Sequence, residues 1–131
     1  MQATTRPRGF GVPLPGFTDG ILPAACPTRT VLDHITSKWG VLILSALSER
    51  PRRWGELRRV VEGVSEKMLA QTLRTLEGDG FVRRDAQATI PPRVDYSLTS
   101  RGVELSERLR PLMQWIADNA DDIVSGQASA S

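Results

Sequence analysis

Three side chains that can hydrogen-bond to nucleic acid recur at helical spacing in the middle of the chain. Lys67, Gln71 and Arg74 are separated by four and three residues, so they share one face of any helix that contains them. Lysine and arginine can donate to O6 and N7 of guanine, glutamine can pair with adenine, and all three can bind phosphate. We expect this face to contact duplex DNA. An ordinary solvated face is the alternative.

The opposite face of the same segment should be buried. Leu69, Leu73 and Leu76 lie at positions i, i+4 and i+7, which predicts one apolar stripe along a helix over about 65–79. Because this stripe must face the core, the side that carries Lys67, Gln71 and Arg74 is left for solvent or a ligand.

The beginning of this helix supports the same interpretation. Ser65 is a suitable N-cap, because its hydroxyl can accept from a free backbone N–H, and the exposed N–H groups of a helix N-terminus can bind phosphate. Ala70 is small enough to permit a close approach or to contact a thymine methyl group. Gly80 is expected to end the helix.

Further basic residues surround this segment and would mostly contact phosphate, which gives affinity and salt dependence rather than sequence choice. They are Arg52, Arg53, Arg58, Arg59, Arg83, Arg84 and Arg93. Arg93 has two alternatives: it enters the minor groove, or it forms an ion pair with Asp95 or Glu77.

The charge of the chain is unevenly distributed. Residues 50–93 contain ten Lys and Arg against six Asp and Glu, a balance of +4, whereas residues 94–131 contain three against six, a balance of −3. A basic middle joined to an acidic end suits a nucleic-acid-binding face with a separate second face. An excess of +4 is also compatible with an ordinary surface.

The order of the predicted elements indicates a winged helix-turn-helix. Helices are expected at about 27–35, 38–48, 54–61 and 65–79, with a loop at 48–53 and a tight turn around Gly63. Strands at 81–85 and 93–98 form a β-hairpin, and a long helix follows Thr99 or Ser100, with Pro111 expected to kink or divide it. The fold class is therefore mainly α with a small β-hairpin.

The chain divides into one domain and two tails. Residues 1–24 are rich in Pro and Gly and form a predicted N-terminal arm, residues 25–124 form the domain, and residues 125–131 form a flexible tail. No apolar run is long enough to span a bilayer, and the start of the chain lacks the pattern of a secretory signal. We therefore expect a cytoplasmic protein that makes no contact with membranes.

Several stretches of the chain, taken in order, resemble the HxlR family of winged helix-turn-helix regulators, relatives of the MarR group. The most specific is Pro91-Pro92-Arg93-Val94-Asp95-Tyr96-Ser97-Leu98-Thr99, and the others lie at 26–27, 37–39, 42–44, 53–59, 63–69 and 73–84. The resemblance covers about 26–123. It implies a homodimer held by the N- and C-terminal helices, a roughly palindromic operator, and repression more often than activation.

The last predicted helix supports a dimer on physical grounds. Its apolar side chains exceed what a domain of this size can cover, so a second chain is expected to bury part of them. These residues are Leu105, Leu109, Leu112, Met113, Trp115 and Ile116. Together with Trp39 they would line either the dimer interface or a pocket for a small-molecule effector.

Cys26 is the single cysteine, so it cannot form a disulfide within the chain. It precedes a predicted helix, whose positive end would favour the thiolate, and some relatives in the HxlR family use a cysteine at this position to sense oxidants or electrophiles. A plain, buried, unreactive cysteine is the alternative. His34 has no neighbouring Cys or His in the sequence, so we expect no metal site and no cofactor.

Two other classes of function compete with DNA binding. An enzyme is disfavoured because no nucleophile–base pair, metal-ligand spacing or phosphate-binding glycine loop is present. A winged helix used only for protein contacts is the second rival, and it should lack a basic recognition face. The operator, the target genes and the effector are not encoded in any motif of the chain.

Overall fold

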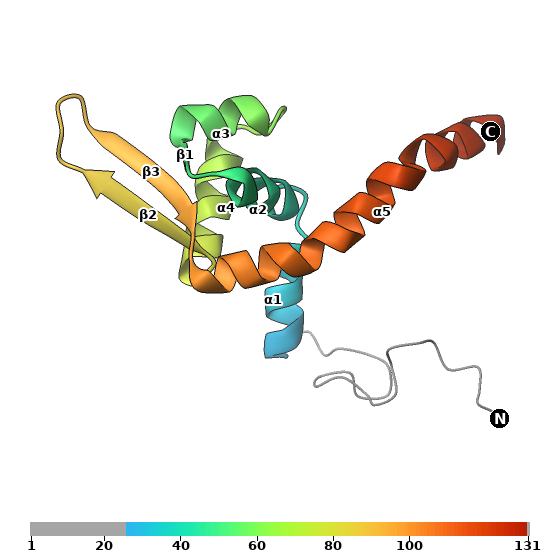
Figure 1. Cartoon of the computed structure of the whole chain (residues 1–131), viewed down its shortest axis with the longest axis horizontal. Coiled ribbons are helices and arrows are strands. Elements are labelled where there is room, and N and C mark those ends of the chain that lie inside the picture. Colours follow the sequence, from blue (N-terminus) through green and yellow to red (C-terminus); the bar gives the residue numbers. More distant parts are fainter. Residues whose placement is uncertain (1–25, 131) are drawn as a thin grey trace.

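The computed structural model describes residues 26–130, so the predicted arm at 1–24 lies outside the described residues. Figure 1 shows a body of short helices from which a β-hairpin and the end of a long helix project. The elements are α1 (Pro27–Ile35), α2 (Gly40–Glu49), β1 (Arg52–Arg53), α3 (Trp54–Val60), α4 (Glu66–Gly78), β2 (Val82–Gln87), β3 (Arg93–Leu98) and α5 (Ser100–Ala130). The expected order of helices and the hairpin is confirmed.

The sheet has three strands rather than the two that were expected. Its strand order is β1-β3-β2, and β1 pairs antiparallel with β3 so that Arg52 lies opposite Tyr96 and Arg53 opposite Asp95. The prediction of a loop over 48–53 was therefore wrong at 52–53. A two-residue strand has no alternation that could mark it in the sequence, because only its pairing with β3 defines it.

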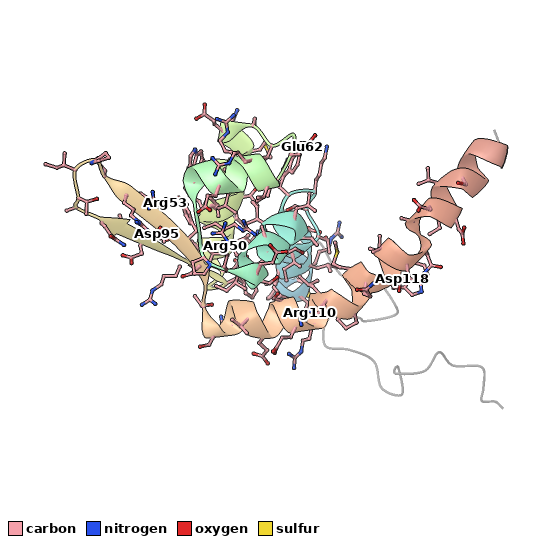
Figure 2. All side chains as sticks on the ribbon, turned by 45° about the horizontal axis from the view of Figure 1, so that its top comes forward. Arg50, Arg53, Glu62, Asp95, Arg110 and Asp118 are labelled. Carbon is pink, nitrogen blue, oxygen red and sulfur yellow. The ribbon has the colours of Figure 1, made fainter. Side chains whose placement is uncertain are left out.

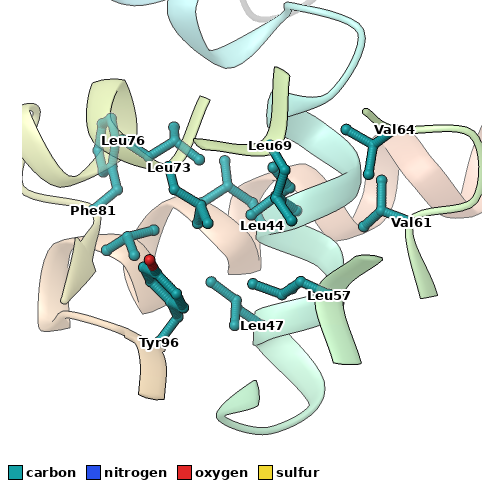
Figure 3. Close-up of a cluster of buried hydrophobic side chains, with 12 residues drawn as sticks. Leu44, Leu47, Leu57, Val61, Val64, Leu69, Leu73, Leu76, Phe81 and Tyr96 are labelled. Carbon is teal, nitrogen blue, oxygen red and sulfur yellow. The ribbon is translucent and has the colours of Figure 1, made fainter. Parts of the chain in front are cut away.

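The core is a cluster of aliphatic side chains from α2, α3 and α4, closed on one side by the sheet (Figure 3). Ile43, Leu44, Leu57, Leu69 and Leu76 are fully buried. Each such side chain contributes about 1.5–3 kcal/mol to folding relative to an exposed position. The leucine stripe predicted for α4 is thus confirmed as the side of the helix that faces the core.

The turn between α3 and α4 has the geometry that its glycine predicts. Gly63 has a φ of 92°, a left-handed conformation that side chains with a Cβ rarely adopt. The N–H of Val64 donates to the carbonyl of Val61 at 3.3 Å, which closes the turn, and Val61 and Val64 are both buried. These contacts fix the angle between the two helices of the helix-turn-helix.

The start of α5 is anchored to the base of the wing, which is the hairpin formed by β2 and β3. The hydroxyl of Thr99 accepts from the N–H of Gly102 at 3.0 Å, and the N–H of Thr99 donates to the carbonyl of Phe81 at 3.0 Å. A Cβ at Gly102 would collide with the backbone of Phe81. Only glycine permits this approach, so the wing and α5 are held together at one point.

Helix α5 is continuous to Ala130. It is not divided at Pro111, although it changes direction partway along its length (Figure 1), as a proline inside a helix commonly causes. Residues 125–130, part of the expected flexible tail at 125–131, continue this helix. None of the described helices is long and apolar enough to cross a membrane.

Candidate nucleic-acid interface

Helix α4 presents a polar face to solvent. Lys67, Gln71 and Arg74 are all exposed, while Ala70 between them is partly buried. On the other side of the helix, Leu73 is buried among the core side chains. The prediction that these three polar residues share an accessible face is confirmed, and their contact with DNA stays a prediction.

The beginning of α4 is capped as expected. The hydroxyl of Ser65 accepts from the backbone N–H of Met68 at 3.1 Å. Glu66 in the first turn lies 3.8 Å from the guanidinium of Arg58 on α3. Ser65 therefore satisfies one backbone donor itself, and Arg58 lies next to the start of α4, where it is exposed to solvent.

The two faces of the wing carry different arginines. In the β2–β3 register, Arg84 lies opposite Tyr96, whereas Arg83 lies opposite Ser97. Because side chains alternate along a strand, Arg84 shares the face of the buried Tyr96, and Arg83 points to the other side. The sequence prediction placed both arginines among the basic residues around the wing and favoured Arg83 as a DNA contact, although this alternation could have pointed to Arg84.

The face that carries Arg84 is turned towards α4. A hollow of about 350 Å³ lies between α3, α4 and the sheet, and it is lined by Trp54, Ala70, Leu73, Arg74, Glu77, Arg84 and Tyr96. Neither Arg74 nor Arg84 has an ion-pair partner among the described residues. Helix α4 and the wing therefore bring two arginines to one site, next to Glu77, and neither arginine forms an ion pair among the described residues.

The opposite face of the wing faces a larger groove of about 820 Å³ beside the start of α3. Its charged lining residues are Arg50, Arg53, Glu56, Arg59, Arg83, Asp85, Arg93 and Asp95. Figure 2 shows Arg50, Arg53 and Asp95 side by side in this region. The groove is therefore lined by most of the arginines that the sequence analysis predicted to contact phosphate.

Ion pairs partly neutralise this groove. The guanidinium of Arg93 lies 3.0 Å from Asp95, which also receives Arg53 at 4.0 Å. Of the alternatives for Arg93, the structure shows the ion pair with Asp95. Arg50 binds Glu56 at 2.8 Å, and this contact, with the N–H of Arg53, lowers the pKa of Glu56 to about 2. Arg59 and Arg83 keep uncompensated charges among the described residues.

Arg52 was predicted to contact phosphate, and the structure contradicts this. Its side chain is only 8% exposed, and its guanidinium donates to the carbonyl of Ala46 at 2.8 Å and to the carboxylate of Glu49. Because β1 pairs with β3, alternation turns Arg52 towards α2 and Arg53 towards solvent. Arg52 therefore stabilises the junction of α2 and the sheet.

Helix α1 connects Cys26 to α4. Cys26 occupies the N-cap of α1 and is partly buried, and hydrogen bonding from the backbone of Arg29 lowers the pKa of its thiol. At the other end of α1, Nδ1 of His34 lies 2.7 Å from Asp79, the residue that caps the C-terminus of α4. His34 thus fixes α1 against α4.

The residues predicted for an effector pocket or a dimer interface do not share one environment. Trp39, Leu105 and Leu109 pack against the core, and Met113 is partly buried. Leu112, Trp115 and Ile116 are exposed, with Trp115 at 58%. They therefore differ in burial, and the exposed members belong to the part of α5 that extends beyond the body (Figure 1).

Comparison with known proteins finds the same architecture. Residues 34–124 match the family model described as HxlR-like helix-turn-helix. The HTH-type transcriptional regulator YtfH of Escherichia coli (strain K12) is 52% identical over 100 residues, which cover 76% of this chain and 79% of that protein. The solved structure of transcriptional regulator ytfH from Salmonella typhimurium is 46% identical, with a TM-score of 0.75, and the match covers 81% of this chain and 95% of that one.

A redox regulator is also among the similar structures. The oxidized form of HypR is 34% identical to this chain, with a TM-score of 0.67, and the match covers 72% of this chain and 97% of HypR.

Proposed function

This chain belongs to the HxlR family of winged helix-turn-helix transcriptional regulators, and we propose that it binds specific sites in double-stranded DNA as a homodimer. The observation that carries the proposal is the polar face of α4. Lys67, Gln71 and Arg74 are exposed opposite a fully buried leucine stripe, in the second helix of a helix-turn-helix. In this architecture the second helix enters the major groove and reads base edges.

The proposed homodimer rests on the uncovered part of α5. Apolar side chains recur there at alternating steps of four and three residues, the spacing of a coiled-coil seam. The seam residues are Leu105, Leu109, Leu112, Ile116, Asn119 and Ile123. The first two pack on the core of their own chain, but Leu112, Ile116 and Ile123 are each more than 40% exposed. A second α5 would cover them, with Asn119 helping to fix the register.

Helix α1 provides a second uncovered surface. It has no buried residue, and both Val31 and Leu32 are exposed. A partner chain would cover α1 and the end of α5 in a symmetric dimer. The two α4 helices of that dimer would be related by a two-fold axis. The two recognition helices would then lie about 34 Å apart, one turn of duplex, and the operator would be a palindrome.

Selection of genomic fragments by the purified full chain tests this proposal. We expect enrichment of one palindromic sequence with half-sites centred about 10 base pairs apart. The expected regulatory outcome is repression in the cytoplasm, because a dimer on such a site would obstruct a promoter. Recovery of fragments without a common sequence would contradict specific binding. Retention of no DNA at all would favour the rival function, a winged helix used for protein contacts.

Regulation by oxidants or electrophiles is the second part of the proposal. Cys26 begins α1, has a lowered thiol pKa, and is joined through α1 and the His34–Asp79 contact to the end of α4. Diamide would take two hydrogens from two Cys26 thiols and leave a disulfide between the chains of the dimer. A change in the position of α1 would then alter the position of α4.

The redox part is tested separately from DNA binding. Diamide is expected to produce a dimer on non-reducing electrophoresis and to change the affinity for the selected operator, and Cys26→Ser should abolish both effects. Unchanged affinity after oxidation of the wild-type chain would exclude regulation through Cys26. The binding of the reduced protein to DNA would remain valid in that case.

A further inference from the structure

The end of the wing carries an apolar side chain in full contact with solvent. Ile90 is 101% exposed, the highest value among the exposed large hydrophobic residues of the described chain. It lies in the connection at 88–92, between the last paired residues of the wing, Gln87 and Arg93. The fold of its own chain does not use this side chain for packing, so Ile90 is available to contact another molecule.

The tip holds this side chain in a defined place. Gln87 and Arg93 are directly paired across the strands, so the hairpin is ordered up to the base of the tip. Two prolines follow Ile90, and proline restricts the backbone. The hydroxyl of Thr89 also donates to the carbonyl of Pro91 at 2.7 Å, across Ile90. Ile90 is therefore presented on a constrained loop.

Positive charge surrounds the base of the tip. Arg53 and Arg93 line a groove of about 540 Å³ that also includes Thr89, Ile90 and both prolines. Both guanidinium groups share the carboxylate of Asp95, so a net positive charge remains beside the apolar tip. Both arginines lie beside the same carboxylate near the tip, where they can bind phosphate of a nucleic-acid backbone.

The wing also has the required position relative to α4. Strand β2 contacts α4, and the two arginines Arg74 and Arg84 line the same hollow between them. Figure 1 shows the tip projecting far beyond this contact. When α4 occupies the major groove, a hairpin in this position reaches the neighbouring minor groove.

We propose that Ile90 inserts into the minor groove beside the operator half-site and bends the DNA there. Apolar wedges, isoleucine among them, partly unstack a base step and kink the duplex towards the major groove. The two wings of a dimer would bend the site on both sides. This wedge rests on the proposed DNA binding and would favour flexible pyrimidine–purine steps, because these are deformed most easily.

The bend is measured by energy transfer between a donor dye and an acceptor dye at the two ends of the selected operator. The full chain is bound to the operator during the measurement. The wild-type chain should shorten the end-to-end distance. Ile90→Ala should remove the bend and weaken binding about tenfold, since the buried apolar area is lost. Ile90→Leu should retain the bend. Ile90→Arg should bind through charge but leave the DNA straight.

The outcomes separate the wedge from DNA binding itself. A complex in which the DNA is straight, or one in which Ile90→Ala bends it as much as wild type does, overturns the wedge and leaves the regulator proposal intact. Failure of the wild-type chain to bind any duplex overturns both. Ile90 lies in an exposed loop outside the core, so these variants are expected to fold.

Discussion

Arg74 on α4 and Arg84 on β2 line the same hollow of about 350 Å³, although they belong to different elements. Their neighbour Arg83 lies on the opposite face of the wing, across from Ser97. The helix and the wing therefore share one surface, and adjacent residues of one strand lie on different faces of the wing.

This relationship predicts different effects for two neighbouring substitutions. Arg84→Ala should weaken binding to the selected operator about fivefold, because the arginine lies beside the recognition helix and would contact phosphate there. Arg83→Ala removes the same charge from the face turned away from α4 and is the matched comparison, for which a smaller loss is expected. Fluorescence anisotropy of labelled operator measures both. Equal losses for the two variants would show that overall charge, not position, determines the affinity.

Arg52 should affect stability rather than recognition. Arg52→Ala leaves the carbonyl of Ala46 without its donor and is expected to lower the free energy of unfolding by about 2 kcal/mol. The pairing with Glu49 adds little, because that carboxylate is largely exposed. Urea denaturation measures the change, with the exposed Arg53→Ala as a control that stays within about 0.5 kcal/mol of wild type. A stable Arg52→Ala variant would contradict the assigned role.

The lowered pKa of Glu56 predicts that the stability of the fold depends on pH. Arg50 and the N–H of Arg53 hold its pKa at about 2 in the folded chain, whereas an unfolded glutamate titrates near about 4.3. The stabilisation is therefore present above about pH 4.3 and is lost as the pH falls towards about 2. Glu56→Gln should lower the Tm at pH 7 and match wild type near pH 2. A Tm difference that is the same at both pH values would exclude this charge effect.

The α5 seam predicts a dimer that a single charge disrupts. Ile116→Glu places a carboxylate in the seam and should convert the dimer to a 14.4 kDa monomer in sedimentation experiments. Ala117→Glu adds the same charge to the adjacent exposed position outside the seam and should leave the dimer intact. The proposed interface would be wrong if Ile116→Glu sedimented as wild type does.

Local sequence signals predicted the parts of the interface that depend on nearby residues. The N-cap at Ser65, the stripe that begins at Leu69 and the left-handed turn at Gly63 each follow from the chemistry of a few consecutive residues. These features orient α4, so its accessible face could be inferred before any coordinates were considered.

Features that depend on distant pairing could not be predicted in the same way. Arg52 looks like any arginine in a basic loop until β1 pairs with β3, whose residues lie more than forty positions further along the chain. That pairing buries Arg52 and exposes Arg53. The end of α5 also differs from the expected tail, because its small polar residues carry no helical pattern in the sequence, whereas the structure continues the helix to Ala130.

The central claim is that the exposed face of α4 contacts base pairs and phosphates. Equilibrium binding of the Lys67→Ala/Arg74→Ala double variant to the selected operator, over a range of salt concentrations, tests it most directly. Arg101→Ala/Arg110→Ala on α5 removes the same charge and is the control. We expect the α4 variant to bind about 100-fold more weakly, with a salt dependence reduced by about one to two ions. An affinity equal to that of the α5 control would contradict the claim.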